Sequence, residues 1–130
     1  MRALVRTAHG IYAVDLDEEE VLGLEPGADV PDVAPAALGL PRVVASAESG
    51  STVVAVVDRR PPLAISNDAG VTWREAGGGL PAGRAVAIAP DDPDLVLYAA
   101  RNRLFLSRDG GRFWHALVAE LPEIDAVAFD

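Results

Sequence analysis

Two copies of one motif decide the fold of this chain. The first is Ser66-Asn67-Asp68-Ala69-Gly70-Val71-Thr72-Trp73, here called motif 1. The second, motif 2, is Ser107-Arg108-Asp109-Gly110-Gly111-Arg112-Phe113-Trp114, which begins 41 residues later (107 − 66 = 41). Both read Ser-x-Asp-x-Gly-x-(Thr/Phe)-Trp. A spacing of this size indicates a repeated supersecondary unit.

Short apolar runs surround each motif in the same order. Turn residues separate these runs, so each unit reads as four short strands with the motif between the third and the fourth. Glycines (12) and prolines (10) are spread along the chain, as expected for frequent turns. The predicted strands are residues 43–47, 52–57, 63–65 and 73–76 in one unit, and 85–89, 95–100, 103–106 and 114–118 in the next.

The two ends of the chain complete a third unit. Residues 124–129 match the first strand of a unit, whereas residues 4–11 match a second strand with its following turn at His9-Gly10. We therefore expect the C-terminal strand to pair with the N-terminal hairpin. Residues 25–39 have no clear period and are interpreted as a connection, with a composition compatible with a helical turn at 34–37. The units are 124–129 plus 2–24, 42–76 and 84–118, within one all-β domain.

Four antiparallel strands repeated at this period are typical of β-propeller blades. The motifs resemble Asp-boxes, the bacterial neuraminidase repeats of sialidases, sortilin-type receptors and photosystem assembly factors. Residues 90–99, before motif 2, also resemble the usual approach to an Asp-box. The resemblance covers residues 40–129, but residues 14–22 contain neither the glycine nor the tryptophan of the motif.

A structural role is predicted for the motifs themselves. The aspartate can accept hydrogen bonds from its own turn, glycine adopts backbone angles that other residues resist, and tryptophan can cover the gap between blades. The resemblance implies the same, because Asp-boxes usually lie away from active sites. The predicted structural residues are Ser66, Asp68, Gly70, Trp73, Ser107, Asp109, Gly111 and Trp114.

Three blades are too few for a ring, since known propellers have about four to eight. Three blades alone would leave two flat blade faces, and we expect these to be large apolar patches. The prediction is a six-bladed propeller formed by two copies of the chain around a twofold axis.

Composition limits the classes of partner. The net charge of −9 disfavours nucleic acid and anionic membranes, because phosphates would be repelled. There is no cysteine, and neither a transition-metal site nor a cofactor motif is evident, so no metal or cofactor is predicted. No signal-peptide pattern is visible at the N-terminus, so a cytoplasmic location is expected, although a removed signal sequence would leave no trace.

The end of each blade opposite the motifs is predicted to be rich in arginine, whereas the motif end gathers acidic residues. Arginine forks suit carboxylate or phosphate groups, so a small anion or a protein segment is the predicted ligand. The alternative is that these side chains only solubilise the rim. The candidates are Arg42 and Arg84, which precede innermost strands, together with Arg59, Arg60, Arg101 and His9.

Binding or scaffolding is the first functional hypothesis, and hydrolysis of an acidic glycan is the alternative. A sialidase-like enzyme would need an arginine triad, a tyrosine nucleophile with a glutamate partner, and an acidic aspartate. Tyr12 and Tyr98 fall within predicted strands away from a central position. Glu123 and Asp125 could serve as a carboxylate pair, but no other feature supports catalysis.

Overall fold

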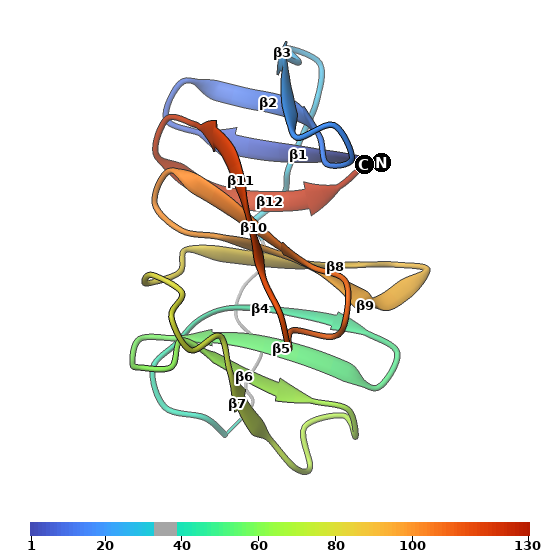
Figure 1. Cartoon of the computed structure of the whole chain (residues 1–130), viewed down its shortest axis with the longest axis vertical. Coiled ribbons are helices and arrows are strands. Elements are labelled where there is room, and N and C mark those ends of the chain that lie inside the picture. The colour runs from blue at the N-terminus through green and yellow to red at the C-terminus, as the bar shows by residue number, and fades with distance from the viewer. Residues whose placement is uncertain (33–38) are drawn as a thin grey trace.

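The computed structural model describes residues 1–32 and 39–130. The described chain is built from strands and the turns between them (Figure 1). It contains no long apolar helix that could cross a membrane within those residues. The strands are β1 (Arg2–Thr7), β2 (Gly10–Asp15), β3 (Glu20–Leu24), β4 (Val43–Ser49), β5 (Thr52–Val57), β6 (Leu63–Ser66), β7 (Arg74–Ala76), β8 (Ala85–Ala89), β9 (Asp92–Ala99), β10 (Arg103–Ser107), β11 (His115–Glu120) and β12 (Ile124–Phe129).

These strands form three four-stranded antiparallel sheets, as the repeat predicts. We call them blade 1 (β12-β1-β2-β3), blade 2 (β4-β5-β6-β7) and blade 3 (β8-β9-β10-β11). The expected pairing of the chain ends is confirmed, because β12 lies antiparallel to β1 with Val127 opposite Val5. The N–H of Ala8 also donates to the carbonyl of Glu123 at 2.9 Å, which extends the seam past the strand ends.

Blade 3 lies between the other two blades, although its strands follow those of blade 2 in the chain (Figure 1). Its innermost strand β8 contacts both β12 and β4. β3 in blade 1 is therefore followed in the chain by β4 in blade 2, on the other side of blade 3. The innermost strands are β12, β4 and β8. Each is an edge strand, so one of its sides has no hydrogen-bonded neighbour within its own sheet.

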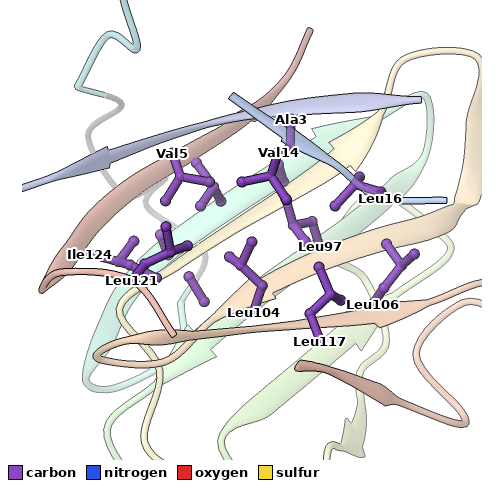
Figure 2. Packing of buried hydrophobic residues seen from close by; sticks show 14 of the residues in the cluster. Ala3, Val5, Val14, Leu16, Leu97, Leu104, Leu106, Leu117, Leu121 and Ile124 are labelled. Carbon is purple, nitrogen blue, oxygen red and sulfur yellow. The ribbon is translucent and has the colours of Figure 1, made fainter. Parts of the chain in front are cut away.

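Two apolar clusters hold the blades together. Figure 2 shows the larger one, in which Ala3, Val5 and Val14 of blade 1 pack toward Leu97 and Leu104 of blade 3. The second cluster joins blades 3 and 2, and its centre is the fully buried Tyr98. The Tyr98 ring makes edge contacts with Phe105 and Trp114, at centroid distances of 6.1 and 5.8 Å. Such edge geometry is favourable between aromatic rings.

The two outer faces of the stack differ from the prediction of exposed apolar patches. On blade 1, strand alternation points Arg2 and Arg6 away from blade 3, and both make ion pairs there. Arg6 binds Asp125 at 2.7 Å, Asp32, and the carbonyl of Val30 at 2.7 Å, so the connecting segment covers part of this face. On blade 2, alternate β5 residues that point away from blade 3 are also buried, namely Val53, Ala55 and Val57.

Several strand boundaries differ from the predicted ones, including the end of β4 at Ser49 and the end of β11 at Glu120. β9 begins at Asp92, inside the turn that was predicted for residues 90–94. The fourth strands begin one residue after each tryptophan, at Arg74 and His115, because the indoles close the preceding turns. The helical turn considered at 34–37 lies outside the described residues.

Candidate functional site

A concave groove runs along the innermost strands of all three blades. It encloses about 460 Å³. The alanines that line it are Ala45 and Ala47 of β4, Ala85 and Ala87 of β8, and Ala126 and Ala128 of β12. Charged side chains reach the groove at its rim, namely Arg84, Asp32, Glu48 and Asp125.

Glu123 gathers two of the predicted arginines at one end of the groove. The Arg84 guanidinium lies 3.1 Å from the Glu123 carboxylate, and Arg101 lies 3.5 Å from the same oxygen. Backbone hydrogen bonds fix this junction, because the N–H of Ile124 donates to the carbonyl of Arg101 at 2.7 Å. The three side chains remain substantially exposed, so water screens the pairs and each stabilises the fold only weakly.

Blade 2 carries three more of the predicted arginines, Arg42, Arg59 and Arg60, together at one of its ends. The N–H of Asp58 donates to the carbonyl of Arg42 at 2.9 Å, which joins the turn before β4 to the turn after β5. All three arginines are exposed, and within the described residues none of them makes an ion pair. Their positive charge is therefore available to a ligand, in contrast to that of Arg84 and Arg101.

A small hollow connects this arginine group with the groove. The hollow has a volume of about 140 Å³ and is lined by Arg59, Arg60 and the segment that leads into β8. Val44 lines both the hollow and the groove, so the two spaces adjoin. Among the described lining residues of the groove itself, Arg84 is the one predicted arginine.

His9 is separate from the groove. It lies exposed in the β1–β2 turn, beside a shallow pocket formed with Leu24 and Pro26. The structure thus joins Arg84 with Arg101, and groups Arg42 with Arg59 and Arg60. His9 belongs to neither set.

Motif 1 forms a self-contained turn. The Asp68 carboxylate accepts hydrogen bonds from the Ser66 hydroxyl at 2.7 Å and from the Thr72 N–H at 2.8 Å. The Thr72 hydroxyl donates to the second carboxylate oxygen at 2.5 Å. The Trp73 indole N–H donates to the carbonyl of Gly70 at 3.1 Å. These donors, with the Thr72 hydroxyl foremost, lower the pKa of Asp68 to about 2.

Motif 2 repeats this network with one change. Asp109 accepts from the Ser107 hydroxyl at 2.8 Å and from the Phe113 N–H at 3.0 Å, and the Trp114 indole N–H donates to Gly111 at 3.0 Å. Phe113 replaces Thr72, so the hydroxyl donor is lost. The Phe113 N–H, followed by the Ser107 hydroxyl, lowers the pKa of Asp109 below its ordinary value. Both networks agree with a structural role for the motifs.

The residues considered for hydrolysis have other engagements. Burial raises the pKa of Tyr98 to about 12, and its hydroxyl donates to the carbonyl of Pro81 at 2.6 Å, unlike an activated nucleophile. Glu123 binds two arginines, and Asp125 binds Arg6. Among the described residues, no cluster of histidine and carboxylate side chains is arranged to hold a metal ion.

Sequence reasoning missed two features of the surface. One is the Arg6 cluster, which depends on Asp32 in a segment without periodicity. The other is Phe113, which is 79% exposed and lines a cleft between blade 1 and blade 3. The alignment of the two motifs shows that Phe113 stands where motif 1 has Thr72. It does not show what lies beside Phe113, because the neighbouring turn of blade 1 does not carry the motif.

Comparison with known proteins supports the fold. No family model matches the chain, and no curated protein matches it by sequence. A GH74 enzyme of Niastella koreensis aligns in structure at a TM-score of 0.52 and 20% identity, over 93% of this chain and 18% of that one. YCF48 bound to D1 peptide aligns at 0.54 and 16% identity, over 95% of this chain and 39% of that one. Both neighbours are β-propellers, so the three sheets of this chain have the fold of propeller blades.

Proposed function

We propose that this protein is a non-catalytic binding module whose arginine-rich end recognises an acidic segment of a partner protein. The observation that carries the proposal is the position of Arg42, Arg59 and Arg60. Within the described chain none of the three makes an ion pair, and Arg59 and Arg60 line, together with Asp58, a hollow that adjoins the groove. Unpaired guanidinium groups suit carboxylates, which they can bind through two parallel hydrogen bonds.

The groove supplies the apolar part of the site. An extended segment could place small side chains against the alanines of β4 and β8 while its carboxylates meet the arginines. YCF48, one of the structural neighbours, is described as bound to a peptide. At 16% identity that likeness concerns the fold, so the support for peptide binding comes from the groove and the arginines.

Peptide titration tests this function. The probe is a short capped peptide of alternating Glu and Ala, and the control peptide carries Gln in place of Glu. Replacing Arg59 and Arg60 by alanine should weaken binding about tenfold or more, because each charge-assisted bond contributes roughly 1.5–3 kcal/mol. Replacing Arg108 and Arg112 by alanine removes the same charge at the opposite end and should change the affinity less than about twofold. Equal weakening by both variants, or equal affinity for the Gln peptide, would contradict the proposal.

We further propose that two copies close a six-bladed ring. The support is the open stack of three blades, whose groove is only one side of the channel that a ring would enclose. The joint at blade 1 would be polar, because Arg2 and Arg6 occupy its outer face. Sedimentation equilibrium should give twice the 13.6 kDa of one chain. A single species of one-chain mass at all concentrations would refute ring closure, while the peptide titration would still test binding.

A further inference from the structure

A second cleft lies at the motif end of the molecule, between blade 1 and blade 3. It encloses about 450 Å³. Its apolar lining comes from Leu16, after β2, and Leu106, in β10, and both residues are buried. One wall is the β2–β3 turn of blade 1, and the other is motif 2. The cleft is formed within a single chain and therefore does not depend on ring closure.

Polar side-chain contacts cross this cleft from one blade to the other. His115 of blade 3 lies 2.8 Å from the Glu19 carboxylate of blade 1. Arg108 lies 3.6 Å from Asp17, which also binds the N-terminal ammonium group at 2.6 Å. The four side chains that cross the cleft thus already have partners, and the Asp109 carboxylate is held by the donors of its own turn. An additional ion would gain little from them, whereas the fixed donors and acceptors remain able to bind neutral hydroxyl groups.

Phe113 gives the cleft an exposed aromatic surface. Phe113 is 79% exposed, and among the described residues it is the one aromatic residue in the set of exposed large hydrophobic residues. In motif 1 the corresponding Thr72 saturates the second oxygen of Asp68. Within the described chain, the hydrogen bonds of the Asp109 carboxylate all involve Oδ1, so Oδ2 is free to accept from a ligand. The presence of Phe in place of Thr therefore has two effects: it provides an exposed aromatic ring, and it leaves Asp109 Oδ2 without a hydroxyl donor.

We propose that this cleft is a binding site for a neutral saccharide. The apolar C–H face of a sugar ring would lie on Phe113, whose π-face carries partial negative charge. The hydroxyl groups would bind Asp109 Oδ2 and the paired side chains of the rim. An apolar surface with a few convergent polar groups is the usual composition of a small-molecule site. The site involves none of the arginines at the opposite end and is independent of the proposed peptide binding.

Titration followed by amide NMR tests the site. The probes are two neutral tetrasaccharides, cellotetraose and maltotetraose, added to the full chain. At least one should give saturable shifts at the amides of motif 2 and of the β2–β3 turn, while the amides of motif 1 serve as an internal control. Phe113→Thr restores the residue of motif 1 and should weaken binding at least tenfold without unfolding the chain. Val71→Thr alters an equally exposed apolar side chain of motif 1 and should change binding less than twofold.

Three results would overturn the proposal. The first is the absence of any shift at motif 2 up to about 50 mM of either sugar, which would place Kd beyond the millimolar range. The second is an unchanged affinity in Phe113→Thr. The third is saturation of the cleft by a charged probe alone, with tetramethylammonium and acetate as the probes, because the paired rim would then be an ion site.

Discussion

The two motifs share one hydrogen-bond network and differ in their neighbours. In both, the serine hydroxyl bridges the aspartate and the glycine N–H, at 2.7 and 2.8 Å in motif 1 and at 2.8 and 2.8 Å in motif 2. Motif 1 belongs to blade 2, at one end of the stack, whereas motif 2 belongs to the central blade and is contacted from both sides.

Contacts on both flanks of motif 2 show this difference. Arg74 of blade 2 donates to the carbonyl of Gly110 at 2.6 Å, and Asp17 of blade 1 receives Arg108 from the other side. The repeated residues thus build the turn, while the residues between them decide what the turn contacts. Substitutions at equivalent positions can separate these two roles.

Glycine substitution should give the largest difference between the motifs. Gly70 and Gly111 both have positive φ, at 90° and 89°, so alanine at either position costs about 1–2 kcal/mol of backbone strain. A Cβ at Gly111 would also lie 2.5 Å from Ile65 of blade 2, which adds about 1–3 kcal/mol of overpacking. In urea unfolding, Gly111→Ala should therefore be clearly less stable than Gly70→Ala. Equal losses in the free energy of unfolding would mean that the Ile65 side chain moves aside at no cost.

Serine substitution should give equal losses in the two motifs. Ser66 and Ser107 are buried, and each hydroxyl makes the same bridging bonds. Replacement by alanine removes the acceptor of the glycine N–H and one donor of the aspartate, so each variant should lose about 1–3 kcal/mol. The measurement is the free energy of unfolding at constant m-value. A neutral result in one motif would show that its network is redundant.

The pKa values of Asp68 and Asp109 should differ, because the Thr72 hydroxyl donates to Asp68 and motif 2 has no such hydroxyl. The pKa of Asp68 is lowered to about 2, so its carboxylate stabilises the fold above the unfolded pKa of about 3.9, and this stabilisation is lost as the pH falls toward 2. Thr72→Val removes the leading donor and should raise the pKa of Asp68. Phe113→Thr should lower the pKa of Asp109 in the reciprocal experiment. Carboxyl NMR measures both, and unchanged midpoints would disprove the assigned role of the hydroxyl.

The smallest effect is expected from Phe113→Thr on stability itself. The ring is mostly exposed, so its removal should change the free energy of unfolding by no more than about 0.5 kcal/mol. A new hydroxyl beside Asp109 could offset even that. A thermal melt is sufficient to check this, and a large destabilisation would show that Phe113 serves packing rather than ligand contact.

The motifs explain how much of this fold could be predicted from the sequence. Their spacing located the strands, and the match of residues 4–11 with 97–104 located the seam between β1 and β12. The outer faces could not be predicted, because the partner of Arg6 lies in the connecting segment, which has no periodic pattern.

The candidate sites were predicted in part. The repeat placed the arginines at one end, but it could not show that Glu123 engages Arg84 and Arg101 while Arg42 makes no ion pair with any described residue. The cleft beside Phe113 requires the turn of blade 1, where the motif is absent. At the arginine-rich end and in the cleft beside Phe113, the sequence predicts the local turn but not which residues of another segment pack against it.

The most direct test of the proposed function is methyl NMR of alanine and valine during titration with the capped Glu-Ala peptide. Val44 and Ala85 line the groove next to the arginines, and their methyl signals should shift with saturation. The alanine methyl of Ala69, in motif 1 at the opposite end, should not move. Shifts confined to Ala69, or no saturable shift at Val44 and Ala85, would contradict recognition of an acidic segment at the arginine-rich end.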